Sequence, residues 1–305
     1  MKSSELPSTK KQNEVVVFVH VPKAAGSTLR QIMDHQYSEQ AVYRCDMLQY
    51  PSAFNDFRNL TEDQTAKIRC LIGHLPYGIH EYLPGPVKYA TILRNPIDRF
   101  LSKYAYLCNN QWVADQLGVE DKQIESLEAF IEMQLQRNAM NFQTRLISGY
   151  VDISSPMPPF DEPVTVDTLE TAKKNLKNDF AVVGLQDRFN ESLVLMKRAF
   201  GWGNVCYLKQ NVTSRPVPRK NVSSQTRSLI ERHNELDMQL FEFAQERFTE
   251  QIQAYGPRFE RDWQDFEIKN KHYFGPTGFW QKTKDLKWKT RYVVNRFLGR
   301  QIPEP

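Results

Sequence analysis

The stretch VVVFVHVPKAAGSTLRQIM, residues 15–33, decides the fold class. It begins with seven residues of which five are valine. Such a continuous β-branched run is typical of a central parallel strand that is covered on both faces. Pro22 then begins a short turn that contains Lys23 and Gly26, and apolar residues follow at helical spacing. The stretch therefore predicts a buried strand, a turn with a lysine inside it, and a helix.

Strands and helices alternate along the rest of the chain. Apolar runs predict strands at 70–73, 89–93 and 180–185, and a short strand at 205–208. Helical spacing predicts helices between them, including a helical stretch over 124–147. This alternation predicts an α/β protein with a P-loop-like three-layer fold, in which helices flank a central, mostly parallel sheet.

Composition divides the chain into three parts. Residues 1–13 are polar and are predicted to be disordered. Residues 14–260 carry the strand and helix pattern and are predicted to form one domain. Residues 261–305 form a basic and aromatic extension. Within it, 284–300 has basic and apolar residues at helical spacing, which suits peripheral contact with a membrane surface, packing on the domain or contact with a partner.

Bulk properties exclude several classes of protein. The chain has 305 residues, of which 40% are hydrophobic and 25% charged, as expected for a globular protein with a sizeable core. A net charge of +4 suits an anionic ligand but is too small to predict nucleic-acid binding. The cysteines lack metal or redox spacing, and no apolar run approaches the roughly 18 residues of a membrane span. Without a visible signal peptide, we expect a cytoplasmic protein, or a Golgi lumenal one if the sequence is part of a longer chain.

The turn at 22–28 has the features of a phosphate-binding loop. Backbone N–H groups at a helix N-terminus favour an anion, and Gly26 permits close approach of the backbone. Lys23 adds a positive charge, and Ser27 and Thr28 add hydroxyl donors. The loop is no Walker A motif, because its lysine comes first and no glycine precedes it. Taken alone, the loop could also be an ordinary turn with a solvated lysine.

A second basic segment, RNPIDRFLSKY, covers residues 94–104. Arg94 follows a predicted strand and can bind a phosphate through paired N–H donors, while Ser102, about two helical turns later, can donate from its hydroxyl. Arg99 and Lys103 add positive charge around that serine. The alternative is an amphipathic helix with a solvated basic face.

Together the two segments resemble the two signatures of sulfotransferases that use PAPS (3′-phosphoadenosine 5′-phosphosulfate). HVPKAAGST and ILRNPIDRFLSKY are similar to the carbohydrate branch, which includes the heparan sulfate 2-O- and 6-O-sulfotransferases. The sequence departs from the family pattern at Ala24, where threonine is usual, and at Asn95, where aspartate is commoner. Further segments that resemble the family are NFQTRLISG (141–149), DFAVVGLQDRFNESLVLMKRAFGW (179–202), NVTSRP (211–216) and NELDMQLFEFAQERF (234–248).

This resemblance implies a sulfotransferase domain, a reaction and a nucleotide site. PAPS would be the co-substrate, PAP the product, and a hydroxyl of a carbohydrate or glycolipid the acceptor, with no metal. The 3′-phosphate would bind to Arg94 and Ser102, and Arg215 would close over the nucleotide from a late loop. The 5′-phosphosulfate would bind to the loop residues Lys23, Ala24, Ala25, Gly26, Ser27, Thr28 and Leu29.

In-line sulfuryl transfer needs a cation near the leaving oxygen and a base for the acceptor hydroxyl. Lys23 is the predicted cation. His74 is the predicted base, because it ends the strand at 70–73, where the resemblance also places the catalytic histidine. An ordinary histidine pKa of about 6.5 suits that role. His20 is interpreted as a packing or loop-orienting residue, and whether it assists catalysis stays open.

Two other functions are weighed. A P-loop kinase or NTPase is disfavoured by the absent Walker spacing and by the lack of an obvious magnesium carboxylate. A non-catalytic relative that binds PAPS is expected to lack Lys23 or His74, and both are present. The acceptor sugar, its hydroxyl and the oligomeric state stay open. Side chains that could face an acceptor, or could merely cap helices and fill the core, are Gln143, Arg145, Tyr77, Tyr104 and Trp112.

Overall fold

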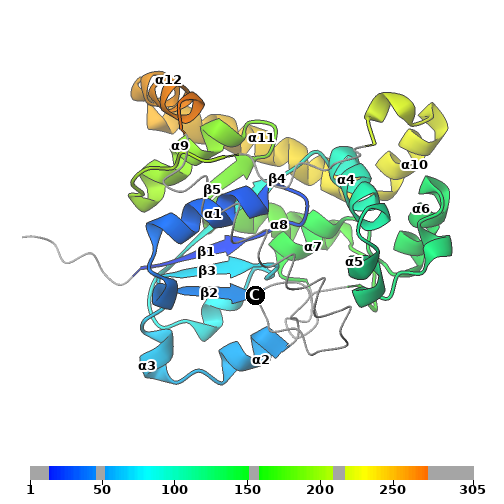
Figure 1. Cartoon of the computed structure of the whole chain (residues 1–305), viewed down its shortest axis with the longest axis horizontal. Coiled ribbons are helices and arrows are strands. Elements are labelled where there is room, and N and C mark those ends of the chain that lie inside the picture. The colour runs from blue at the N-terminus through cyan, green and yellow to red at the C-terminus, as the bar shows by residue number, and fades with distance from the viewer. Residues whose placement is uncertain (1–13, 46–51, 151–157, 209–216, 274–305) are drawn as a thin grey trace, which may run out of the picture.

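The structure is a computed structural model, and it describes residues 14–45, 52–150, 158–208 and 217–273. Three predictions fall outside these residues: the disordered segment 1–13, the nucleotide contact of Arg215 and the basic helix at 284–300. The predicted α/β fold with a parallel central sheet is confirmed (Figure 1).

One parallel sheet of five strands forms the centre of the described part of the chain. Its strand order is β2-β3-β1-β4-β5. From β1 the chain passes to β2 at one edge of the sheet and then to β3, which lies beside β1. It next crosses over β1 to β4 on the other side, so the direction in which strands are added to the sheet reverses beside β1. The strands are β1 (Val15–Val19), β2 (Val42–Cys45), β3 (Cys70–Gly73), β4 (Val87–Leu93) and β5 (Phe180–Leu185).

The strand β1 is the most enclosed part of the sheet. All five of its residues are buried, and it lies between β3 and β4, as the valine run predicts. Val19 pairs in register with Gly73 on one side and with Thr91 on the other. The carboxyl ends of these three strands therefore lie at one edge, which is where ligands bind in parallel α/β sheets.

Helices surround the sheet and extend past its carboxyl edge (Figure 1). Helices α8, α9 and α11 pack on β5, and α12 packs on α9. The predicted domain boundary at residue 260 falls inside α12, and the domain division stays a prediction. The helices are α1 (Gly26–Gln36), α2 (Ser52–Arg58), α3 (Glu62–Thr65), α4 (Pro96–Cys108), α5 (Gln111–Gln116), α6 (Leu127–Gln136), α7 (Phe142–Ser148), α8 (Val166–Asn178), α9 (Phe189–Phe200), α10 (Ser224–His233), α11 (Glu235–Tyr255) and α12 (Arg258–Lys271), with 3-10 turns at Glu39–Ala41, Ile79–Tyr82, Asp121–Gln123 and Arg219–Asn221.

A second apolar cluster lies beyond the carboxyl edge of the sheet. Helices α4, α5, α6 and α10 gather there (Figure 1), and they enclose side chains such as Phe100, Phe130 and Ile230. This cluster is separate from the large core around the sheet. Helix α4 follows β4 directly, so its side chains are positioned between the sheet edge and the second cluster.

Two local predictions are wrong. The helical stretch expected over 124–147 is broken into α6 and α7, because Asn138 and Asn141 adopt positive φ values of 49° and 52°. Asparagine tolerates this left-handed conformation better than most residues. Residues 205–208 form no strand, and there the backbone N–H of Tyr207 donates to the Asn270 side chain at 2.8 Å instead.

Candidate active site

The loop between β1 and α1 has a strained backbone. Lys23 and Ala25 have φ values of 70° and 64°, in the left-handed region that glycine prefers. Each such residue costs about 1–2 kcal/mol, and strain of this kind concentrates at ligand sites. Ala25 is also the N-cap of α1, and no side chain caps the first turn. The first N–H groups of α1 are therefore open to an anion.

The side chains of the loop point in different directions. Thr28 and Leu29 are buried, with exposed fractions of 8% and 0%, whereas Ser27 is exposed. Ala24 is buried as well, so the usual threonine of the family is replaced by a residue whose methyl group packs in the core. We infer that an anion at this loop would be bound through the backbone and Ser27 more than through Thr28.

The imidazole of His20 occupies the space beside Gly26. A Cβ atom added to Gly26 would lie 1.6 Å from Nε2 of His20. On its other side, the His20 ring packs against the ring of His74, with 4.4 Å between centroids. The close approach predicted for the Gly26 backbone is thus an approach to the His20 side chain. The His20 ring contacts both His74, at the end of β3, and Gly26, at the start of α1.

The environment of His20 disfavours its charged form. Burial lowers its pKa well below 6.5, and the neighbouring His74, Arg30 and Lys23 lower it further. His20 is therefore a neutral ring at neutral pH. His74 is buried at the end of β3, where its backbone N–H donates to the carbonyl oxygen of Cys45 at 3.1 Å.

Arg94 is joined to the loop and is held by Gln143. Its Nη1 donates to the carbonyl oxygen of Lys23 at 2.8 Å. The amide of Gln143 pairs with both backbone groups of Arg94: Oε1 accepts from its N–H at 3.0 Å, and Nε2 donates to its carbonyl at 2.9 Å. Gln143 is thus a positioning residue for Arg94. Arg145 instead donates to backbone carbonyls, including that of Glu162 at 2.5 Å, so its role is structural.

Lys23 lies over the ring of Tyr106, a residue that was not among the predicted site residues. Its Nζ is 3.8 Å from the centroid of the Tyr106 ring, a cation–π contact worth about 0.5–2 kcal/mol. Burial, together with the charge of Arg94, lowers the pKa of Lys23 to about 8. The signal that would have found Tyr106 is the spacing of Arg99, Lys103 and Tyr106, which places them on one face of α4.

Helix α4 begins at the sheet edge with a capped N-terminus. The Asn95 side chain accepts a hydrogen bond from the N–H of Ile97 at 3.1 Å, so this departure from the family pattern keeps the capping function of aspartate. Ser102 is partly exposed on α4, and its contact with a 3′-phosphate stays a prediction. Asp98 forms a paired ion contact with Arg219, with 2.8 Å between Oδ2 and Nη2.

The aromatic residues that could face an acceptor or fill the core lie in other surroundings. Tyr77 packs on Tyr89 and Phe180, and its hydroxyl donates to Asp179 at 2.8 Å. Tyr104 packs on Phe130 in the second apolar cluster. Trp112 is 40% exposed on α5. The packing of Tyr77 and Tyr104 agrees with the core interpretation weighed for them.

Replacing Gly26 by alanine is expected to lower the free energy of unfolding by about 3 kcal/mol, because the new methyl group would overlap the His20 ring. Urea unfolding measures this. The double variant G26A/H20A should recover part of the loss, because removal of the ring makes room. Gly203→Ala is the matched control, since a Cβ there meets nothing closer than 3.8 Å. Equal effects at both glycines would contradict the contact.

Comparison with known proteins identifies the class. The family comparison assigns the chain to the sulfotransferase family enzymes. The profile described as galactose-3-O-sulfotransferase matches residues 2–273. The chain belongs to this family, and the prediction of a carbohydrate sulfotransferase that resembles the heparan sulfate enzymes is confirmed and made more specific.

Similar proteins carry consistent names. Galactosylceramide sulfotransferase of Mus musculus is 26% identical over 282 residues, which cover 84% of this chain and 62% of the relative. The Homo sapiens protein of that name is 26% identical over 258 residues, covering 79% and 58%. Heparan-sulfate 6-O-sulfotransferase 3-B of Danio rerio is also 26% identical, covering 80% and 66%. A solved structure, mouse sulfotransferase SULT7A1 complexed with PAP, is 16% identical with a TM-score of 0.38, covering 75% of this chain and 66% of that one.

The expected cytoplasmic location is wrong. The galactosylceramide sulfotransferases are Golgi type II membrane enzymes with the catalytic domain in the lumen. This chain spans 62% and 58% of the length of the mouse and human galactosylceramide sulfotransferases. The absence of a visible signal peptide from the sequence therefore does not decide the compartment. In the part of the chain that the structure describes, no helix is long and apolar enough to cross a membrane.

Proposed function

We propose that this protein transfers the sulfuryl group of PAPS to the 3-hydroxyl of a galactose unit on a glycolipid or glycan. The observation that carries the proposal is the meeting of three predicted site residues at one sheet edge. Lys23 lies in the strained loop, Arg94 donates to its backbone, and His74 contacts the ring that packs on Gly26. The name of the family profile, galactose-3-O-sulfotransferase, supports the galactose 3-hydroxyl as the acceptor.

The residues present fit a nucleotide with an anionic group at each of two ends. PAPS supplies an activated sulfuryl group and carries negative charge at both its 5′ and 3′ ends. The open N–H groups at the start of α1 and the charge of Lys23 suit the 5′ end. The guanidinium of Arg94, which donates from Nη1 to the carbonyl oxygen of Lys23, suits the 3′-phosphate. Ser102 is proposed as a further donor there.

The chemistry assigned to the chain is proton removal and charge stabilisation. His74 would accept the proton of the acceptor hydroxyl, and its neutral neighbour His20 would keep it in place through ring packing. Lys23 would hold a positive charge beside the leaving phosphate, where negative charge builds during transfer. Its pKa is lowered by burial and by the charge of Arg94, and a bound anion would raise that pKa again.

The names of the relatives support the acceptor. Two of them are galactosylceramide sulfotransferases, so a galactose on a lipid is the first acceptor to test. The assay is transfer of labelled sulfate from PAPS to galactosylceramide and to galactose-terminated oligosaccharides, with the position of the ester read by mass spectrometry. Sulfation at the 3-hydroxyl supports the proposal. Transfer to another hydroxyl, or none from PAPS to any galactoside, contradicts it.

Arg94→Ala is expected to weaken PAP binding by about 10- to 100-fold, because a charge-assisted hydrogen bond contributes about 1.5–3 kcal/mol. Isothermal titration calorimetry with PAP measures the change. Arg261→Ala is the control, since this arginine on α12 has a side chain that is 68% exposed. Equal PAP affinity in R94A and in the native protein would refute the assignment of the 3′-phosphate site. Tighter binding of ADP than of PAP would instead favour a nucleotide kinase.

A further inference from the structure

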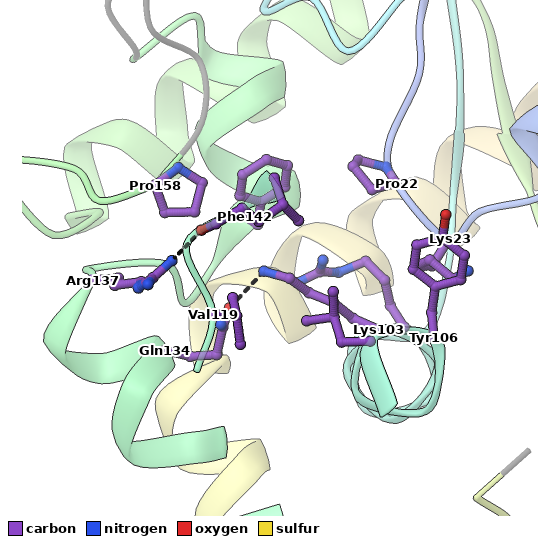
Figure 2. A pocket seen from close by; sticks show the side chains of 12 residues that line it. Pro22, Lys23, Lys103, Tyr106, Val119, Gln134, Arg137, Phe142 and Pro158 are labelled. Atoms are coloured by element: carbon purple, nitrogen blue, oxygen red, sulfur yellow. Dashed lines mark hydrogen bonds between the residues drawn. The ribbon is translucent and has the colours of Figure 1, made fainter. Parts of the chain in front are cut away.

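A pocket lies directly beside the loop at the carboxyl edge of the sheet. Its cavity volume is about 60 Å³, and Figure 2 shows Lys23 and Tyr106 on one side of it and Arg137 and Pro158 on the other. Arg94 and Ser102 do not line it, so it is distinct from the proposed 3′-phosphate site. Its lining is Pro22, Lys23, Arg99, Lys103, Tyr106, Leu107, Leu117, Val119, Gln134, Arg137, Phe142 and Pro158.

Four of these lining residues are basic, and among the described residues that line the pocket none is acidic. Arg99 is almost fully buried, and its Nε atom has no hydrogen-bond partner in the described structure. Oδ2 of Asp237, on α11, is 3.8 Å from Nη2 of Arg99. That carboxylate also accepts hydrogen bonds from the backbone N–H groups of Gln143 and Thr144, so it is largely engaged with α7.

Lys103 lies between the two sides of the pocket (Figure 2). Its Nζ donates to Oε1 of Gln134 at 2.6 Å, and this partner is neutral. Burial, followed by the charges of Arg99 and Arg137, lowers the pKa of Lys103 to about 7. Cations without a facing anion are unfavourable in a low-dielectric site, so an anion that bound here would be stabilised and would favour the charged form of Lys103.

The walls of the pocket restrict the ligand further. Leu107, Leu117 and Val119 are apolar, and Phe142 and Pro158 add flat apolar surfaces. A small inorganic ion would leave these walls uncovered. A sugar ring that carries a charged group has the right chemistry, because its C–H faces pack on apolar surfaces while the charge meets Lys103 and Arg137.

We propose that this pocket binds an anionic substituent of the acceptor glycan, a carboxylate or a sulfate ester, so that the enzyme prefers acidic galactosides to neutral ones. This inference rests on the proposed function. The anion would lie near Lys103 and Arg137, on a sugar next to the galactose, because Pro22 and Lys23 of the loop line the same pocket. The pocket then acts as a specificity site beside the transfer site.

Three disaccharides that differ only at one carbon test the proposal. They are galactosyl-glucose, galactosyl-glucuronate and galactosyl-glucose 6-sulfate. The native enzyme is expected to use an acidic acceptor with a kcat/KM at least about tenfold higher than that of the neutral one. The two acidic sugars tell a carboxylate site from a sulfate site. Equal kcat/KM for all three overturns the proposal.

A substitution at Lys103 tests whether the preference for acidic acceptors arises in this pocket. Lys103→Met keeps the length of the side chain but removes the charge, and it is expected to reduce the ratio of acidic to neutral kcat/KM to about one. Lys122→Met is the control, since Lys122 is an exposed lysine paired with Glu120, and the ratio should be unchanged. An unchanged ratio in K103M, or a loss of PAP affinity instead of a change in ratio, would assign the pocket to another role.

A binding measurement on the native protein is independent of turnover and of the folding of variants. With PAP bound, calorimetry at pH 7 in buffers of different ionisation enthalpy should show proton uptake on addition of galactosyl-glucuronate, because an anion raises the pKa of Lys103 from about 7. Galactosyl-glucose should show none. Equal proton uptake for both sugars refutes the anion site. Proton uptake with galactosyl-glucuronate alone, in a protein that transfers no sulfate, would instead refute the proposed function and leave the assignment of the anion site standing.

Discussion

His74→Ala is expected to lower kcat for sulfate transfer by about 10²- to 10⁴-fold, the usual contribution of a general base. The physical reason is that the acceptor hydroxyl is a weak nucleophile until its proton is removed. Added imidazole should restore part of the activity, because a small base can enter the space that the side chain leaves. Initial rates with labelled PAPS, with and without imidazole, measure both effects.

The neighbouring histidine provides the comparison for that experiment. His20 lies 4.4 Å from His74 between ring centroids, and its pKa is well below 6.5, which makes it a weak base. His20→Ala should reduce activity through loss of packing, and imidazole should not rescue it. If H20A shows the larger and rescuable loss, the base is His20 and our assignment is reversed.

Lys23→Met is expected to lower kcat/KM by about 10²- to 10³-fold, because it removes the charge that we propose stabilises the leaving phosphate. Methionine keeps an apolar chain of similar length over the ring of Tyr106, so the loop should stay folded. Lys67→Met, at an exposed lysine outside the site, should leave the rate unchanged. A K23M enzyme with the native rate would show that the leaving group is stabilised elsewhere.

The pH profile gives an independent test of Lys23. The proposed role of Lys23 requires its charged form, and its pKa is lowered to about 8 by burial and by Arg94, so kcat/KM should fall as pH rises above about 8. This alkaline fall in kcat/KM reports the pKa of Lys23 in the free enzyme. Since a bound anion favours the charged lysine, the corresponding fall in kcat should come at higher pH. In Lys23→Arg the alkaline limb should move out of range, because arginine stays charged.

Local sequence patterns predicted the parts of the fold that depend on neighbouring residues. The strand, turn and helix over 15–33 followed from a valine run and a glycine turn, and all three are present. Strand β2 was missed because it has four residues, VYRC, of which three are only partly buried. The break between α6 and α7 depends on two asparagines whose left-handed conformation is set by tertiary packing as well as by residue type.

Side chains that meet across the sequence were much harder to predict. Gln143 holds the backbone of Arg94 from a position 49 residues away, and no spacing rule connects them. The ring of Tyr106 under Lys23 and the basic pocket around Lys103 depend on which face α4 presents to the loop. The sequence therefore identified the segments of the site, whereas the structure was needed for their supporting partners.

The contact between His20 and Gly26 has a consequence for the evolution of the family. Because a single added carbon at position 26 would overlap the imidazole, the residues at these two positions cannot change independently. A relative with alanine or serine at position 26 is expected to have a residue smaller than histidine at position 20. Positions 20 and 26 should therefore covary among homologues, and the pair would mark lineages in which the residue at position 74 packs against a ring and lineages in which it is supported in another way.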